Sequence, residues 1–374
     1  MPVDHQVLQH DMSSSAADAF AGAASPERPK LKLVVFSAAM GLTALVVYLM
    51  VVGQPILLPF VIAVFSWYLI NAVAMLSARI RFRGRSLPAR LRVGVAIALL
   101  LLVAWLAVHL IIANVNQVMA AGPVYEKNLL RLANRGGSWL GYDQLNDVRV
   151  LLASLNINGL IRSLTLGLTA MLGSLGTIAI YTVFLLLEQH HFDAKLTALV
   201  QNPEHEALVR RILQRIGTEV QTYVWLKTII SLTTAVACYA VMKLVGLDLA
   251  EFWALVIFAL NFIPYIGSWL GVIFPAFLAL IQFESLTPFA VLTVALTIIQ
   301  FTGGSIIEPR LMGKGLNVSP VFMLMSLAVW GTIWGVVGMF LAVPIMVVMM
   351  IVCSNVKATR PIAILLSADG VLRS

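Results

Sequence analysis

Residues Phe252 to Ile281 read FWALVIFALNFIPYIGSWLGVIFPAFLALI and carry the strongest indication of the fold. The stretch has no formal charge, and as one straight helix it would be about 45 Å long, whereas a bilayer core is about 30 Å thick. Pro264 and Gly267 lie near its middle, where proline removes a backbone donor and glycine tolerates unusual backbone angles. The pattern predicts a broken helix at membrane depth, which survives only where protein or a wet cavity surrounds the break.

Composition places the whole chain in a membrane. Of its 374 residues, 60% are hydrophobic and 11% are charged, and the mean hydropathy is +0.94. Apolar runs of about 20 residues predict an all-α polytopic membrane protein with about eight membrane segments. The positive-inside rule explains the net charge of +8 better than a nucleic-acid partner does. The two cysteines lie in apolar runs, so we expect no disulfide framework, no metal site and no cofactor.

Charge and hydropathy divide the chain before its C-terminal core. The predicted parts are a disordered cytoplasmic tail (1–30), three transmembrane spans (31–113), an extramembrane amphipathic segment (114–163), a further span (164–187) and a cytoplasmic amphipathic helix (188–222). Six arginines between residues 79 and 92 place the loop after the second span, and with it the N-terminus, in the cytoplasm. Apolar residues at helical spacing predict an amphipathic helix at 145–155 and another at 208–220, which runs directly into the fifth span.

Residues 223–353 form the predicted transport core, and residues 354–374 a second cytoplasmic tail. If 252–281 and 321–352 each crossed the membrane once, Arg310 would lie outside, against the positive-inside rule. If both segments are hairpins, Arg310 and the basic residues after the core lie inside. Glycines between 331 and 338 interrupt the second segment, as Pro264 and Gly267 interrupt the first. We expect two hairpins that enter from opposite sides, as in inverted-repeat transporters, while kinked full spans stay an alternative.

Polar side chains at membrane depth are the natural candidates for a site. The candidates for the substrate or ion pathway are Asn261, Pro264, Tyr265, Gly267, Gln300, Glu308, Arg310 and Lys227. The glycines expected to allow close packing and hinge motion are Gly303, Gly304, Gly331, Gly335 and Gly338.

Most of these side chains also have an ordinary interpretation. Asn261 either binds cargo or satisfies carbonyls freed by Pro264, and Tyr265 faces either a cavity or the membrane interface. Glu308 and Arg310 form either a mobile ion pair or two anchors at the membrane edge. Lys227, one turn into its span, is expected to snorkel to the cytoplasmic interface rather than bind an anion.

The sequence contains no clear motif of an enzyme. Glu188, His190, His191 and Asp193 crowd together, but they lack the histidine pair at i and i+4 that a catalytic zinc helix needs. His109 is a lone histidine near a span end, which favours a structural role over a proton relay. No phosphate-binding glycine loop with a lysine is present, so the sequence predicts a protein that is not an enzyme and a transporter driven by a gradient.

Four motifs in fixed order resemble the autoinducer-2 exporter family of bacterial permeases, also called PerM-like. The motifs are LNFIPYIG at 260–267, IEPRLMGK at 307–314, LNVSP at 316–320, and the run from Trp330 to Pro344. Ser268 departs from the pattern, because many members carry proline there. The resemblance covers 221–352 most strongly, and implies a homo-oligomeric inner-membrane transporter, for which a pentamer is one arrangement, with both termini in the cytoplasm.

Three functions are consistent with these observations. The leading hypothesis is gradient-driven export of a small polar molecule, and the resemblance adds the quorum-sensing signal autoinducer-2 as a cargo. The second is a sodium/proton antiporter in which Glu308 titrates. The third is a membrane scaffold that transports nothing. In each case the expected partners are the lipid bilayer and further copies of the chain, with no nucleic acid.

Overall fold

The computed structural model describes residues 27–77, 81–82, 85–86, 88–140, 157–200, 202–312 and 317–371. The chain divides into two compact units between Gln54 and Pro55. The described part of the first unit is one helix, α2 (Glu27–Val52). The expected disordered tail lies outside the described residues, apart from 27–30, which begin α2.

Membrane-length apolar helices dominate the described chain. Six helices are long and apolar enough to cross a bilayer, and three shorter apolar helices cover 37–52, 173–188 and 250–260. Together they account for each apolar segment that the sequence predicts. The predicted fold class, an all-α polytopic membrane protein, is therefore confirmed.

The second unit opens with α3 (Gln54–Ser77), whose first residue is the last of the first unit. A hairpin of two short strands, β1 (Arg81–Phe82) and β2 (Arg85–Ser86), and then α4 (Ala89–Leu140) follow. The small hairpin in the arginine-rich loop is not a feature that charge or hydropathy indicates. The third span was expected to end near Ala113, but α4 continues for 52 residues in total. The amphipathic helix predicted at 145–155 lies outside the described residues.

Three helices lead into the core: α6 (Ile157–Glu188), α7 (Phe192–Leu199) and α8 (Pro203–Val245). Asn202 caps α8, because its side-chain oxygen accepts the backbone N–H of Glu204 at 2.9 Å, and proline follows at the first helical position. The helix ends at Gly246, whose φ is 80°. With 43 residues, α8 is about 64 Å long, so the predicted amphipathic helix does run directly into the fifth span.

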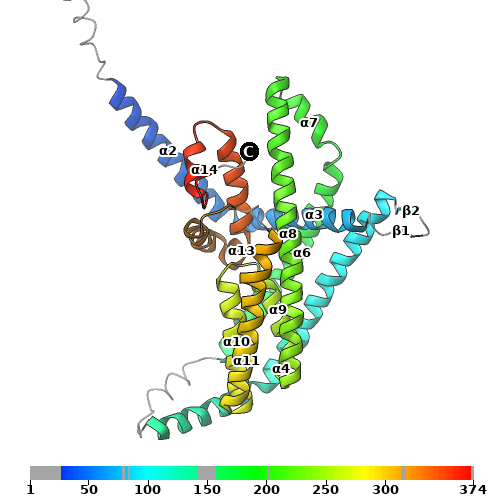
Figure 1. Ribbon diagram of the computed structural model, residues 1–374, viewed down its shortest axis with the longest axis vertical. Helices are drawn as coiled ribbons and strands as arrows, with labels where there is room; N and C mark the ends of the chain where they lie inside the picture. Colours follow the sequence, from blue (N-terminus) through cyan, green and yellow to red (C-terminus); the bar gives the residue numbers. More distant parts are fainter. Residues whose placement is uncertain are drawn as a thin grey trace, which may run out of the picture. The chain divides into compact units, whose positions relative to one another are not determined.

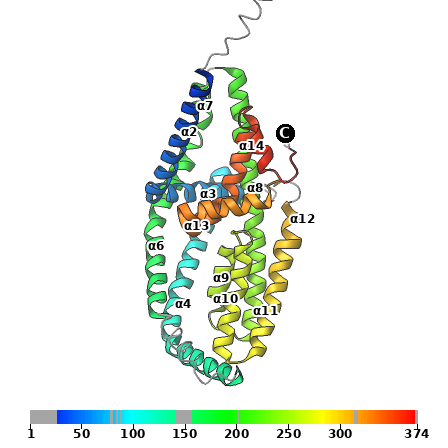
Figure 2. The same ribbon diagram turned by 90° about the vertical axis from the view of Figure 1, so that its left-hand side faces the viewer.

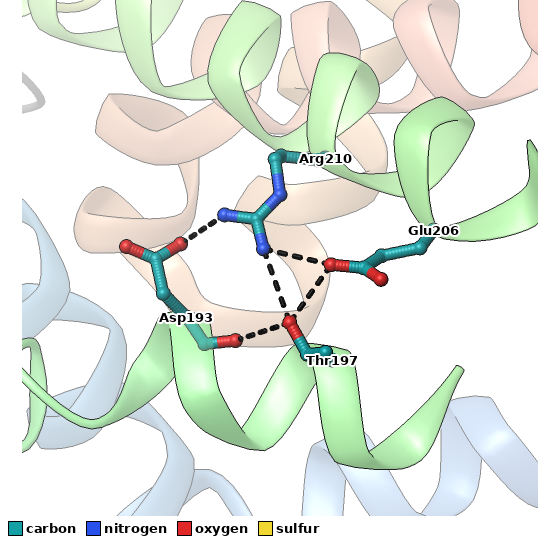
Figure 3. A network of polar contacts seen from close by, with 4 residues as sticks. All are labelled: Asp193, Thr197, Glu206 and Arg210. Carbon is teal, nitrogen blue, oxygen red and sulfur yellow. Dashed lines mark hydrogen bonds and ion pairs between the residues drawn. The ribbon is translucent and has the colours of Figure 1, made fainter. Parts of the chain in front are cut away.

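A polar network ties α7 to the first turns of α8 (Figure 3). The Arg210 guanidinium donates to the Asp193 carboxylate, and its Nη2 donates to Glu206 Oε1 at 2.9 Å. The Thr197 hydroxyl lies between them and donates to Glu206 Oε1 at 2.8 Å. Isolated surface ion pairs contribute little to folding stability. The planar guanidinium of Arg210, however, joins two carboxylates and a hydroxyl, and so fixes the relative position of the two helices.

We expect the Arg210→Ala substitution to loosen α7 with little effect on the rest of the protein. The network is exposed, so its loss should cost about 1 kcal/mol or less. Amide hydrogen exchange at residues 192–199 should become faster, since α7 has no buried residues to hold it. Arg211→Ala is the matched control, because the exposed Arg211 side chain donates to the carbonyl of Ala207, one turn earlier in its own helix. Equal exchange in both variants would contradict this prediction.

The core continues with α9 (Ala250–Leu260), α10 (Ile266–Phe283), α11 (Leu286–Phe301), the π-helix η1 (Thr302–Ile307) and α12 (Glu308–Met312). Helices α8, α9, α10 and α11 run side by side in both ribbon views (Figures 1 and 2). The buried apolar cluster between them includes Cys238, Ile257, Leu292 and Leu296, each at 0% exposure.

The first predicted break is present between α9 and α10. Tyr265 has φ 62° and ψ −57°, and the Ile266 N–H donates to the Pro264 carbonyl at 2.7 Å. These values define a γ-turn of positive φ, a rare and strained conformation for a residue with a side chain. The chain then reverses, so that α9 and α10 pack against each other as a hairpin.

The second predicted break lies inside α13 (Pro320–Asn355). Gly335 has φ 64° and ψ −145°, backbone angles that essentially only glycine adopts. The preceding residue, Trp334, is also non-helical. The Ser326 hydroxyl donates to the Ala342 carbonyl at 3.2 Å, whereas 16 residues of straight helix would separate them by about 24 Å. The segment therefore folds back on itself, as the hairpin hypothesis requires.

The two breaks meet each other. Ile263 at the first break shares one buried cluster with Leu327 and Ala342 from the two arms of α13. The rings of Phe262 and Phe340 lie 4.6 Å apart between centroids. The first break is therefore buried against the two arms of the second hairpin.

The segment after α13 is structured rather than a simple tail. Helix α14 (Arg360–Leu366) packs on α13, with Ala363 fully buried. The Ser319 N–H donates to the Leu366 carbonyl at 2.9 Å, and Val318 forms a bridge with Ser367. These bonds fasten the C-terminal residues to the entry of the second hairpin.

The far part of α4 holds the open end of the first hairpin. Asn128 Nδ2 donates to the Ile281 carbonyl at 3.1 Å, and the Tyr125 hydroxyl donates to Asp248 Oδ2 at 3.0 Å. Burial, and then this bond to Asp248, raises the pKa of the Tyr125 phenol, so it stays a donor at neutral pH. Helix α4 therefore contacts both α9 and α10.

Replacing Asn128 with leucine should destabilise the protein by about 1–2 kcal/mol, since a buried acceptor at Ile281 loses its donor. The measurement is the unfolding temperature of purified protein in detergent. Lys127→Leu is the control, because Lys127 is the adjacent residue and is exposed. A shift of the same size in both variants would mean that the hydrogen bond contributes nothing.

Candidate functional site

A cavity of about 610 Å³ lies beside the first break, in the C-terminal core. Helices α8, α10, α11 and α13, the break itself and the η1–α12 segment supply its wall. This volume is within the range of about 300–1,000 Å³ that small-molecule sites occupy. Its wall combines apolar side chains with a group of polar and charged ones.

The cavity wall holds a buried ion pair. The Lys227 ammonium of α8 donates to both oxygens of the Glu308 carboxylate, at 2.6 and 2.7 Å. The side chain of Lys227 is 5% exposed and that of Glu308 is 24% exposed. Two charges removed from water stabilise each other strongly, but either would be costly alone. Their combined charge is zero, so the cavity carries no net charge from this pair.

The π-helix η1 and a glycine place Glu308 against α8. The Glu308 N–H donates to the Gly303 carbonyl, five residues earlier, which turns the following residues relative to an ordinary α-helix. A Cβ on Gly303 would lie 2.8 Å from Thr234 Oγ1, so a larger residue there would force the Thr234 side chain to move, whereas glycine lets η1 approach α8 closely. Short π-helical turns of this kind occur frequently at functional sites.

Two further polar groups of the cavity wall lack hydrogen-bond partners within the described residues. They are the Tyr223 hydroxyl and Nε2 of Gln300, both buried. Gly271 makes room for Gln300, because a Cβ there would lie 2.6 Å from Nε2.

The structure brings most of the predicted pathway residues together. Those that line the cavity are Lys227, Asn261, Pro264, Tyr265, Gln300 and Glu308. Gly304, which was predicted as a close-packing glycine, also lines it. Gly267 and Gly303 do not line the cavity. They allow close packing instead, Gly267 against the backbone of Leu260 and Gly303 against the side chain of Thr234. Gly331, Gly335 and Gly338 belong to the second break and do not line the cavity.

One expectation about a charged residue is wrong, and one of the two alternatives given for Glu308 and Arg310 does not hold. Lys227 does not snorkel to an interface, since its side chain is almost fully buried and bonded to Glu308. Glu308 pairs with Lys227 and not with Arg310, which is exposed and does not line the cavity. The reason is the π-helix, which directs Glu308 inward while Arg310 lies two residues further on.

Other residues of the cavity wall were not predicted from the sequence, although a signal for them exists. Residues 223, 227, 230 and 234 line the cavity from α8, and residues 293, 297, 300 and 304 line it from α11 and η1. Both sets follow the spacing i, i+4, i+7 and i+11, which is one face of a helix. Polar residues at that spacing within an apolar span could have indicated two facing walls.

The residues that the structure describes contain no cluster of side chains suited to bind a metal ion. Within them, no group of three or more His, Cys, Asp or Glu side chains could hold a metal ion. The polar residues after α6 instead form ion pairs, with Lys195 bonded to Glu188 and Arg210 to Asp193.

Membrane-length helices, two helical breaks in contact and a cavity with a buried ion pair define a multi-pass membrane protein of the transporter class. The chain belongs to the AI-2E transporter family. The model of this family, described as AI-2E family transporter, matches residues 37–358. The resemblance stated from the motifs is thereby confirmed.

Known relatives of this chain include proteins of two bacteria. The AI-2 transport protein TqsA of Escherichia coli (strain K12) is 27% identical over 345 residues, which cover 90% of this chain and 96% of TqsA. The YhhT protein of the same organism is 29% identical over 289 residues, or 76% of this chain and 81% of YhhT. A Borreliella burgdorferi protein is 32% identical over 200 residues, or 53% of this chain and 55% of that protein.

Proposed function

We propose that this protein is a gradient-driven secondary transporter that exports a small polar molecule across the bacterial inner membrane. The leading cargo is the quorum-sensing signal autoinducer-2, because the relative TqsA is named as an AI-2 transport protein. The protein acts as a transporter and not as an enzyme.

The observation that carries this proposal is the buried Lys227–Glu308 pair on the wall of the cavity beside the first break. Ionisable residues inside the membrane are costly and mark substrate or ion pathways. Broken helices that line a cavity are typical of the binding sites of secondary transporters. Asn261, Tyr265 and Gln300 are the proposed cargo contacts, and the glycines at both breaks permit movement.

The proposed topology follows from charge. Both termini and the arginine-rich loop lie in the cytoplasm, the first hairpin enters from outside, and the second enters from inside. A reporter fused after Gln282 should give a periplasmic signal, and a cytoplasmic signal would overturn the two-hairpin topology. We further propose a homo-oligomer, whose subunit number native mass spectrometry would measure.

Flux through purified protein in liposomes tests the proposed transport. Labelled autoinducer-2 should cross the membrane faster than in empty liposomes, and an imposed proton or sodium gradient should drive it. The matched control is the double variant Lys227→Met/Glu308→Gln, which lacks both charges without leaving one unpaired. Folded protein that carries neither this signal nor any other polar solute or ion would exclude transport and favour a scaffold.

A sodium/proton antiporter is the second candidate, because Glu308 is the one carboxylate among the described cavity-lining residues and is a quarter exposed. In that case Glu308 exchanges its lysine partner for sodium or a proton. Adding sodium outside liposomes should then move protons outward with no organic cargo present, which a pH-sensitive dye would record. No dye response would exclude this candidate and leave export of an organic solute.

A further inference from the structure

One side of α4 contacts the open end of the first hairpin through three polar side chains. They are Tyr125, Asn128 and Arg131, which recur every three residues and so follow one side of the helix. Tyr125 and Asn128 donate hydrogen bonds to the α8–α9 turn and to the last turn of α10. Arg131 Nη1 donates to Oε1 of Glu284, the C-terminal cap of α10, at 2.9 Å. We call these three residues the α4 clasp.

The partners of the α4 clasp belong to one block at the end of the hairpin. The Gln282 side chain donates to the Gly246 carbonyl at 2.9 Å and accepts the Asp248 N–H at 2.8 Å. These bonds tie the α8–α9 turn to the end of α10 without any contribution from α4. Opening of the clasp would therefore release the hairpin from α4 while the block itself stays joined.

The rest of α4 joins the clasp to the N-terminal spans. Near the start of the helix, Ala96 is fully buried in a cluster with Ile70 of α3. Further along, Leu101 and Trp105 are 60% and 62% exposed, and 6% of the apolar window within residues 91–114 is buried. Helix α4 thus packs on α3 near one end and on the first hairpin towards the other, with little packing between.

Polar contacts of this kind can open and re-form, because water replaces the partners when they separate. The ion pair is already partly hydrated, with side-chain exposures of 50% for Arg131 and 17% for Glu284. At its other end the hairpin carries the break at Pro264 and Tyr265, which line the cavity. Since α10 has 18 residues and is about 27 Å long, a rotation of the hairpin at its open end moves the cavity wall.

We infer that the α4 clasp is the outer latch of the transport cycle. It holds the first hairpin against α4 while the cavity is closed to the outside, and it opens to admit the outer solution to the cavity. Tyr125, Asn128 and Arg131 are positioning residues, which contact the hairpin and no cargo. The inference rests on the proposed transport function and on the proposed topology, in which this end of the hairpin faces outward.

Labelling of a thiol in the cavity wall tests whether the clasp controls access. Ser268, which lines the cavity, is changed to cysteine in full-length protein whose two native cysteines are replaced with alanine. In intact bacterial cells, Tyr125→Phe/Arg131→Met should speed labelling of this thiol by a membrane-impermeant reagent at least about fivefold. Lys243→Met is the matched control, because it breaks a partly exposed ion pair that joins α8 to α9 and not to α4.

Reversible cross-linking tests whether the clasp must open during transport. Arg131→Cys/Glu284→Cys carries two thiols that a short bis-methanethiosulfonate reagent can join and that a reductant releases. Cross-linking should lower the flux of labelled autoinducer-2 in liposomes at least about tenfold, and the reductant should restore it. The control is Arg131→Cys alone, whose flux the same reagent should leave unchanged, since it has no second thiol to join.

The two measurements separate the latch from the transport function. Undiminished flux in the cross-linked protein would show that the clasp is a fixed strut and overturn the inference. Equal labelling rates in the clasp variant and in Lys243→Met would overturn it as well, even where flux is normal. Absence of flux in every variant, with faster labelling in the clasp variant, would remove the transport function and keep the latch.

Discussion

A Lys227→Met variant is expected to lose transport and to unfold at a lower temperature than the native protein. The substitution leaves the Glu308 carboxylate without its partner in a site from which water is largely excluded. Removing one partner of a buried ion pair costs about 3–5 kcal/mol, and since Glu308 is 24% exposed we expect a value near the lower limit, about 3 kcal/mol.

The double variant Lys227→Met/Glu308→Gln separates stability from function. It leaves no unpaired charge, so most of the lost stability should return, while transport should stay absent because both charges are gone. Thermal unfolding in detergent and flux in liposomes are the two measurements. Recovery of stability without recovery of flux would assign the pair a role in transport beyond holding α8 and α12 together.

The chain offers a matched control pair. Lys243 Nζ lies 2.7 Å from Glu251 Oε1, nearly the same distance, but these side chains are 60% and 37% exposed. The Lys243→Met substitution should therefore cost about 1 kcal/mol or less and leave transport intact. If Lys227→Met had as small an effect as Lys243→Met, the buried pair would be neither structural nor functional.

The sequence was most informative where a local rule determines the structure. The breaks at Pro264 and Gly335 follow from segments too long for one span, interrupted by residues that cannot continue a helix or that tolerate unusual angles. The continuous helix from the amphipathic segment into the fifth span followed from apolar residues at helical spacing.

Contacts between distant residues were less accessible to sequence reasoning. Lys227 and Glu308 are 81 residues apart, and a lysine one turn into a span is indistinguishable, by position alone, from one that snorkels. The π-helix that directs Glu308 inward has no simple sequence signal apart from Gly303 and Gly304. The extension of α4 to Leu140 was missed because its later half is polar, and polarity outside the membrane does not separate a helix from a loop.

Substituting alanine for Gly267 or Gly338 is expected to prevent assembly of the core. A Cβ on Gly267 would lie 1.8 Å from the Leu260 carbonyl oxygen, and one on Gly338 would lie 1.9 Å from that of Trp330. Both obstacles are backbone atoms at the end of a helical arm, so no side-chain rotation can relieve the overlap. Overpacking of this severity should cost about 3 kcal/mol or more.

The two breaks thus use one device, a glycine placed against a carbonyl in the last turn of the preceding arm. Ile263 of the first break also shares a buried cluster with Ala342 in an arm of the second hairpin. A disturbance at either should therefore lower the yield of monodisperse protein and the unfolding temperature together. Gly173→Ala is the matched control, because its Cβ would meet nothing within 4 Å, and in a helix the change should be neutral or stabilise by about 0.5–1 kcal/mol. Folded, transport-competent Gly267→Ala protein would mean that the first hairpin tolerates a wider turn than its backbone now shows.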